Sequence, residues 1–159
     1  MNRITFLEQF KAFTVDKTHD IIMPVRTQKV GEAQGNRAAD VYLMRLKDSS
    51  AAQKKAPYII HQLITGKDDQ AQGQNVSSVA VVRSIFCVYN EDEEEGSLML
   101  VNLMERLRIH LLKQVVIGHQ FILDLEAGLE TLVYPDDTAP YYAGEMVSTW
   151  KLPAVKREV

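Results

Sequence analysis

Cysteine is almost absent from this chain of 159 residues, in which Cys87 stands alone. A single cysteine excludes a framework of intrachain disulfides and is typical of proteins that work in a reducing compartment. Cys87 lies in an apolar run with the pattern of a β-strand, so we expect a buried and unreactive thiol at this position.

The chain also lacks an excess of positive charge and any long apolar run. Its 18 lysines and arginines face 21 aspartates and glutamates, which gives a net charge of −3 and argues against a dedicated nucleic-acid binder. No apolar run approaches the roughly 20 residues of a membrane-spanning helix, and the opening MNRITFLEQF has no apolar segment typical of a signal peptide. We therefore expect a protein without a membrane segment, folded in a cytoplasm.

Motifs that would point to an enzyme are missing as well. The sequence has no HExxH, no second cysteine to complete a zinc site, no GxGxxG and no GxSxG. Gly66-Lys67 resembles the end of a phosphate-binding loop, but Asp68 follows in place of the Ser or Thr that would bind magnesium. His61 lies inside a strand-like run, where a core histidine is expected. We predict no catalytic residue, no metal site and no cofactor.

What the chain does contain is one strongly amphipathic segment, from Gly96 to Gly118. Ser97 is its predicted N-cap, and the acidic run 91–95 before it favours the positive end of a helix dipole. Gly118 can adopt the left-handed conformation that ends a helix. The apolar side chains that recur at helical spacing are Leu100, Met104, Leu107, Leu111 and Val115.

The rest of the pattern predicts a second helix and a series of strands. Asn2 to about Val15 forms a helix with Asn2 as N-cap and with Ile4, Leu7 and Phe10 on its apolar side, for which Phe6 and Phe13 are further candidates. The strands are expected at 41–46, 56–64, 79–89, 121–123, 130–134 and 142–152. The run 79–89 is apolar on both alternating sides, which is typical of a central strand covered on both faces.

The order α-β-β-β-α-β-β-β predicts an α+β fold, in which a mostly antiparallel sheet packs against two helices. Neither a repeat nor a linker divides the sequence, so residues 1–159 are expected to form a single domain. Two polar segments near 27–40 and 65–78 are expected to be mobile loops, and 153–159 a charged C-terminal tail. Loops of this length in a compact domain often have a function.

Three groups of residues allow more than one interpretation. The acidic run 91–95 is either a solvated turn that complements the helix dipole or a charged contact with a neighbouring subunit. Asp136 and Asp137 resemble a catalytic carboxylate pair, but adjacent side chains project apart and the flanking prolines mark a turn. The aromatic residues of the last quarter, which either pack in the core or anchor an interface, are Tyr134, Tyr141, Tyr142 and Trp150.

Three stretches of the sequence carry a family resemblance: APYIIHQLITGKDDQ, IFCVYNEDEEEGSLMLVNLMERLRIHLLKQVVIGHQF and LETLVYPDDTAPYYAGEMVSTWKLPAVKREV. Together they resemble a family of small minor tail proteins from phages and prophages of Gram-positive bacteria. The resemblance covers about the last two thirds of the chain, and its most specific pieces are the helix followed by IG and the run YPDDTAPYYAGEMVSTW. The size and the helix–strand order are similar to those of the tail terminator, or tail completion, proteins of long-tailed phages.

The resemblance implies a non-enzymatic virion component that assembles as a homo-oligomer, usually a hexameric ring, on the end of the tail tube. Such a ring stops polymerisation of the tube and provides the surface for joining the head. Its implied partners are the tail tube protein and the head–tail connector proteins, with no membrane and no sequence-specific contact to DNA that passes through the ring. It is built in the host cytoplasm and ends in the tail or neck of the virion.

Two other functions stay open at this point. The first is a head–tail connector or adaptor subunit, and the second is a small cytoplasmic binding domain unrelated to virions. Under the virion interpretation, charged and aromatic residues of the loops and turns are the candidates for contacts between subunits or with the tube: Lys67, Asp68, Asp69, Glu93, Glu94, Asp136, Asp137, Tyr141 and Tyr142.

Overall fold

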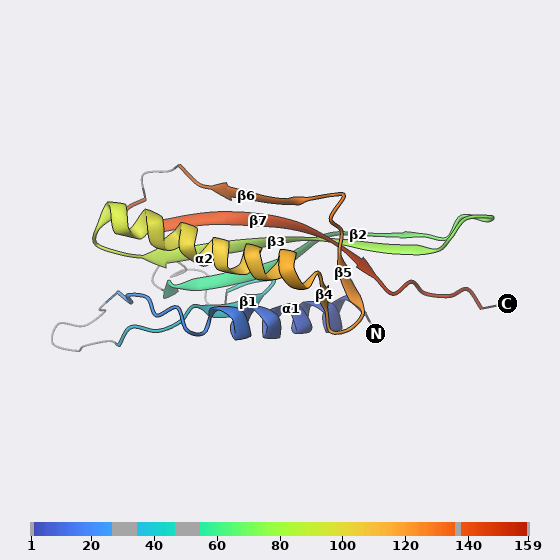
Figure 1. The fold of residues 1–159 in the computed structure, drawn as a ribbon, viewed down its shortest axis with the longest axis horizontal. Helices are drawn as coiled ribbons and strands as arrows, with labels where there is room; N and C mark the ends of the chain where they lie inside the picture. Colours follow the sequence, from blue (N-terminus) through green and yellow to red (C-terminus); the bar gives the residue numbers. More distant parts are fainter. Residues whose placement is uncertain (1, 27–34, 47–54, 136–137, 159) are drawn as a thin grey trace.

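The computed structural model describes residues 2–26, 35–46, 55–135 and 138–158. In these residues, two helices and seven strands follow one another as α1 (Arg3–Thr18), β1 (Asp40–Leu43), β2 (Tyr58–Asp69), β3 (Ser77–Tyr89), α2 (Glu93–Gln114), β4 (Val116–Ile117), β5 (Phe121–Leu123), β6 (Leu129–Val133) and β7 (Tyr141–Leu152). The strands form one sheet in the order β1-β2-β3-β7-β5-β4, and β6 pairs with β7 as well. Figure 1 shows an elongated molecule whose long strands run along its length.

The predicted α+β fold with a mostly antiparallel sheet is wrong, because the sheet is a curled, mixed one. β1 runs parallel to β2, and one edge of β7 is shared between β6, which pairs with Gly144–Ser148, and β5, which pairs with Trp150 and Lys151. Four strands follow α2, where three were expected. The alternation of apolar residues indicates which side of a strand faces the core, but strand direction and neighbours depend on the connections, which alternation does not report.

One large core joins the two helices to one face of the sheet. Phe6 and Phe10 of α1 lie 5.1 and 5.3 Å from the ring of Trp150 on β7, measured between ring centroids. Leu107 of α2 and Phe86 of β3 are fully buried in the same cluster. The body of the protein is therefore held by contacts between residues far apart in the sequence.

Helix α1 begins where the sequence predicted, and its predicted apolar side is buried except for Ile4. The Asn2 side chain accepts a hydrogen bond from the backbone N–H of Thr5 at 3.0 Å, so its N-cap role is confirmed. Ile4 is 65% exposed, whereas the predicted Leu7 and Phe10 and the further candidates Phe6 and Phe13 are all buried. The aromatic side chains set the orientation of the helix because they bury more apolar surface than an isoleucine.

Helix α2 has the predicted apolar stripe except for Val115, and it both starts and ends earlier than predicted, with Val115 and not Gly118 at its C-terminal end. Leu100, Met104, Leu107 and Leu111 are all buried. The N-cap is Asp92, whose carboxylate accepts a hydrogen bond from the N–H of Glu95 at 3.0 Å, while the hydroxyl of Ser97 donates to the carbonyl of Glu93 inside the helix. The glutamates of the acidic run thus form the first turn of the helix, close to the positive end of its dipole.

The predicted loop 65–78 is mostly a β-hairpin. β2 continues to Asp69 and β3 starts at Ser77, with Asp69 opposite Ser77 in the register. The register shifts between Leu63 and Thr65, which leaves Ile64 as the extra residue of a bulge. In Figure 1 this hairpin projects beyond the body beside the C-terminal tail. We call residues 64–78 the arm.

The other expectations for strands and loops have mixed outcomes. β3 is central, between β2 and β7, but it is not covered on both faces, because Arg83 is exposed. On the face opposite the helices, a second apolar cluster that includes Tyr58 and Tyr141 covers only the C-terminal end of the strand. Cys87 belongs to that cluster and is buried, which raises the pKa of its thiol to about 11. Residues 27–34 of the predicted loop 27–40 lie outside the described residues, and 153–158 have no secondary structure.

Candidate assembly surfaces at the two ends

The candidate contact residues fall at opposite ends of the long axis. Figure 1 places the start of α2 and the start of β7 at one end, and the tip of the arm and the C-terminal tail at the other. We call the first the acidic end and the second the arm end. The acidic end carries Glu93, Glu94, Tyr141 and Tyr142, and the arm end carries Lys67, Asp68 and Asp69. Asp136 and Asp137 lie outside the described residues.

At the arm end, one ion pair connects the arm to α1. The Arg3 guanidinium lies 2.9 Å from the carboxylate of Asp68. Hydrogen bonds from Ser78 and Arg3 lower the pKa of Asp68 below its usual value. Lys67 is exposed, and Asp69 accepts a hydrogen bond from the N–H of Ala71 at the turn. Of the three candidates on the arm, Lys67 is therefore the one with its charge turned to solvent and no partner among the described residues.

The C-terminal tail runs beside the arm. The Gln70 side chain donates a hydrogen bond to the carbonyl of Val155. The Val155 side chain is nevertheless 71% exposed, and Lys156 and Arg157 after it are exposed too. Neither basic side chain forms an ion pair with another described residue. We call residues 153–158 the tail segment.

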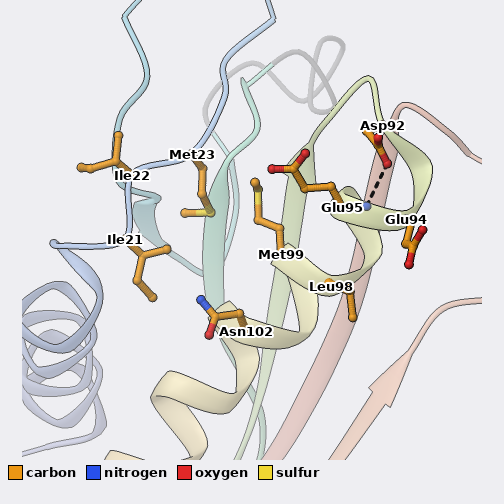
Figure 2. Close-up of a pocket in the computed structure, with 9 residues that line it drawn as sticks. All are labelled: Ile21, Ile22, Met23, Asp92, Glu94, Glu95, Leu98, Met99 and Asn102. Atoms are coloured by element: carbon orange, nitrogen blue, oxygen red, sulfur yellow. Dashed lines mark hydrogen bonds between the residues drawn. The ribbon is translucent and has the colours of Figure 1, made fainter.

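A groove lies at the acidic end, between the first turns of α2 and the extended segment 21–23. It has a volume of about 520 Å³ and is lined by Ile21, Ile22, Met23, Asp92, Glu94, Glu95, Leu98, Met99 and Asn102. Figure 2 shows Met23 and Met99 facing each other across it, with the carboxylate of Glu95 above Met99. We call it the acidic groove.

The lining of the acidic groove combines apolar surface with unpaired negative charge. Met23 is fully buried at its floor, while Ile22 is 58% and Leu98 63% exposed at its sides. The carboxylates of Glu94 and Glu95 are exposed and form no ion pair within the described chain. A surface of this kind can bind an extended segment that brings an apolar side chain followed by positive charge.

The sequence interpretation missed this groove, although signals for it were present. The run Ile-Ile-Met-Pro-Val at 21–25 is short and apolar, and Pro24 favours an extended backbone before it. Leu98 lies outside the predicted apolar stripe of α2, so its exposure on a second side of the helix was foreseeable. The sequence does not indicate that the segment 21–23 and the side of α2 with Leu98 line the same groove.

The tyrosines at the acidic end are built into the subunit. Tyr141 is 6% exposed, its ring lies 5.5 Å from that of Tyr89, and its hydroxyl accepts a hydrogen bond from Arg26 at 2.9 Å. The hydroxyl of Tyr89 donates to the carboxylate of Glu91, which raises the pKa of Tyr89. Tyr141 therefore has little surface for another molecule and instead braces the start of the acidic run.

Tyr142 occupies a different position, against the first turns of α2. A Cβ placed on Gly96 would lie 2.3 Å from Cε2 of the Tyr142 ring, so glycine at this helical position permits the close approach. Tyr142 is half-buried. Its ring ties β7 to the start of α2, so the position of the acidic groove depends on the sheet.

The buried histidine has the environment of a structural group. His61 Nε2 lies 2.7 Å from Thr14 Oγ1, and Nδ1 lies 2.7 Å from Ser84 Oγ. Because the Thr14 hydroxyl donates to the Phe10 carbonyl at 2.8 Å, it accepts from His61, which assigns the proton of the neutral ring to Nε2. Burial lowers the pKa of His61 to about 3. The expectation of a core histidine is confirmed.

The described residues bring together no group of three or more His, Cys, Asp or Glu side chains that could hold a metal ion. Neither helix of the described chain has the length and apolar character that crossing a bilayer demands. The absence of catalysis, metal and cofactor stays a prediction. The surfaces at the two ends differ in shape and charge. One end has a groove with negative charge, and the other has projecting segments that are partly basic.

Comparison with known proteins returned no matching family model and no matching curated relative. The resemblance to phage tail proteins therefore depends on the sequence stretches quoted above.

Proposed function

We propose that this protein is a structural subunit of a phage tail, which forms a ring on the end of the tail tube. The ring terminates polymerisation of the tube and provides the surface for joining the head. The observation that carries the proposal is the pair of chemically different surfaces at opposite ends of an elongated subunit. Closed rings with head-to-tail contacts require two different, complementary patches on each copy.

The nature of the hollows supports assembly over catalysis. The acidic groove is an open trough lined by apolar side chains and carboxylates, and His61, the histidine inside the sheet, is enclosed by Thr14 and Ser84. Burial of Cys87, the single cysteine, keeps its thiol away from solvent. The sequence resemblance supplies the rest: the ring, its usual six copies, and its place on the tube.

A first experiment tests the ring itself. The purified full-length protein is examined by sedimentation velocity over a wide concentration range and by negative-stain microscopy. We expect a closed assembly of several copies with a central hole. A protein that stays monomeric at every concentration and is absent from purified virions would overturn the proposal.

A second experiment separates a terminator from a connector. Deletion of the gene in the producing phage should yield tail tubes of uncontrolled length if the protein ends the tube. Tubes of normal length that fail to join heads would instead identify a head–tail connector subunit. Complementation with the wild-type gene on a plasmid is the control, and it should restore both tube length and joined heads.

A further inference from the structure

The acidic groove and the tail segment have matching chemistry. The groove presents Met99 at its floor, Ile22 and Leu98 at its sides, and the carboxylates of Glu94 and Glu95. The tail segment reads Pro-Ala-Val-Lys-Arg-Glu, so one exposed apolar side chain precedes two basic ones. Within the described chain, the charges on both partners lack ion pairs. Each surface therefore has what the other lacks.

A subunit cannot place this segment in its own groove. β7 has 12 residues and spans about 40 Å at ~3.3 Å per residue. Its first residues lie at the groove end, because Tyr142 touches Gly96 near the start of α2. Arg157 follows Leu152 by five residues, which reach about 18 Å at most from the far end of β7. The tail segment that fits the groove must come from another copy.

The tail segment is also free to move to such a position. It has no secondary structure, and one hydrogen bond from Gln70 to the carbonyl of Val155 attaches it to the arm. In Figure 1 it projects from the arm end, away from the body. Release from the arm exchanges this exposed hydrogen bond for burial of Val155 and pairing of two charges.

We propose that the tail segment of one subunit docks in the acidic groove of a second copy. Val155 packs on Met99 between Ile22 and Leu98, and the basic side chains of Lys156 and Arg157 lie beside the carboxylates of Glu94 and Glu95. Glu158 follows outside the groove, in solvent. The inference rests on the proposed function in one respect, since it assumes that copies assemble head to tail; repeated around a ring, the same contact joins every neighbouring pair.

Charge reversal tests the contact in the full-length protein. Lys156→Glu with Arg157→Glu changes only an exposed segment and leaves the fold intact. We expect this variant to need at least a tenfold higher concentration to assemble, as measured by sedimentation velocity, and Glu94→Lys with Glu95→Lys to have the same effect. The protein that combines all four changes should recover assembly, because the charges then match again. Wild-type assembly should also weaken as salt is raised.

The matched control is Glu126→Lys with Glu130→Lys, which reverses two exposed glutamates away from the groove and should leave assembly unchanged. Circular dichroism melting curves identify any variant that fails to fold. If the tail variant folds and assembles like wild type, or if the four-fold variant recovers nothing, the docking proposal is wrong.

Cross-linking between two different variants tests the geometry directly. A protein with Val155→Cys is mixed with one carrying Leu98→Cys under mild oxidation, and we expect a disulfide-linked dimer that contains one copy of each. Replacing the second partner by Ile122→Cys, an exposed position on β5, should abolish the dimer. Cys87 does not interfere because it is buried.

The outcomes separate this inference from the proposed function. If rings form, but the cross-link does not and the tail variants assemble like wild type, the docking proposal is wrong and the ring proposal stands. A cross-link that forms in open chains without closed rings would support the docking and overturn the terminator. Wild-type protein that never self-associates would overturn both, and a groove occupied by a different protein in purified virions would overturn the docking.

Discussion

The acidic end and the arm end differ in how firmly the rest of the protein holds them. At the acidic end, a capped helix start, the Tyr89–Tyr141 pair and the contact between Tyr142 and Gly96 fix the groove from several sides. At the arm end, a two-stranded hairpin and an irregular tail project from the body with few side-chain contacts. The acidic end is therefore preformed, whereas the segments of the arm end can adapt to another surface. This difference favours contacts between the acidic end of one copy and the arm end of another.

The largest expected effect tests whether both ends depend on the same core. Leu107 is fully buried between α2 and the sheet. Leu107→Ala should lower the free energy of unfolding by ~2–5 kcal/mol through lost burial and a cavity. Urea unfolding monitored by tryptophan fluorescence measures it. The control is Val101→Ala on the same helix. Val101 is 41% exposed, so its replacement should lower the free energy of unfolding much less. A loss below about 1 kcal/mol for Leu107→Ala would contradict the core assignment.

The next effect is a loss of stability in acid, caused by the buried His61 of β2, which lies three residues before the arm. The pKa of His61 is about 3 in the folded protein, against an ordinary value near 6.5, so the unfolded chain binds the proton more readily. Stability from this group is complete above pH 6.5 and falls as the pH drops from 6.5 toward 3, by up to about 1.4 kcal/mol per pH unit. Urea unfolding at several pH values between 7 and 4.5 measures the slope.

The control for this slope is His61→Gln, which keeps polar atoms in the same place but does not titrate. We expect its unfolding free energy to change much less between pH 7 and 4.5. An equal slope in wild type and variant would show that other groups carry the acid sensitivity.

Two glycines sharpen the comparison between the ends. A Cβ on Gly96 would lie 2.3 Å from the Tyr142 ring, and a Cβ on Gly66 would lie 2.5 Å from the Arg3 guanidinium. Gly96→Val should cost ~1–3 kcal/mol, because the ring is held between the helix and the sheet. Gly66→Val should cost much less, since the end of the Arg3 side chain can move aside and valine favours strands. Thermal unfolding of the two variants compares them, and equal losses would contradict a firmly held acidic end.

The smallest effects concern two aspartates. Asp92→Ala removes the N-cap of α2 and should cost ~1 kcal/mol, with little dependence on salt. Asp68→Ala removes an exposed ion pair, so a smaller loss is expected, which added salt should reduce further. Thermal unfolding at low and high salt measures both. A larger loss for Asp68→Ala would show that the arm is held more firmly than its contacts indicate.

The sequence predicted those features that depend on local periodicity or on capping. The Asn2 cap, the buried stripe of α2 and the burial of His61 all follow from short-range patterns. The hairpin of the arm was missed because its strands have no core to face, so residues such as Lys67 and Asp68 show no alternation of apolar and polar character. Its sequence therefore resembles that of a loop.

The start of α2 and the acidic groove failed for different reasons. Asp92 and Ser97 are both good caps, and Gly96 suggested a helix boundary, whereas its role is to admit the Tyr142 ring. The groove is lined by Ile22 on one side and Leu98 on the other, and nothing local to either residue indicates the other. The parallel pairing of β1 with β2 likewise depends on chain connections and not on composition.

The bulge at Ile64 decides which charge of the arm faces α1. Past this single extra residue, the even-numbered side chains of β2 take over the side that the odd-numbered ones occupied before it, so Asp68 lies opposite Ser78 and meets Arg3. If Ile64 paired with Val81 in a regular ladder, without the bulge, Lys67 would lie opposite Ser78 in place of Asp68, and attraction to Arg3 would become repulsion. A one-residue irregularity in the ladder thus selects the sign of the charge that fastens the arm to the first helix.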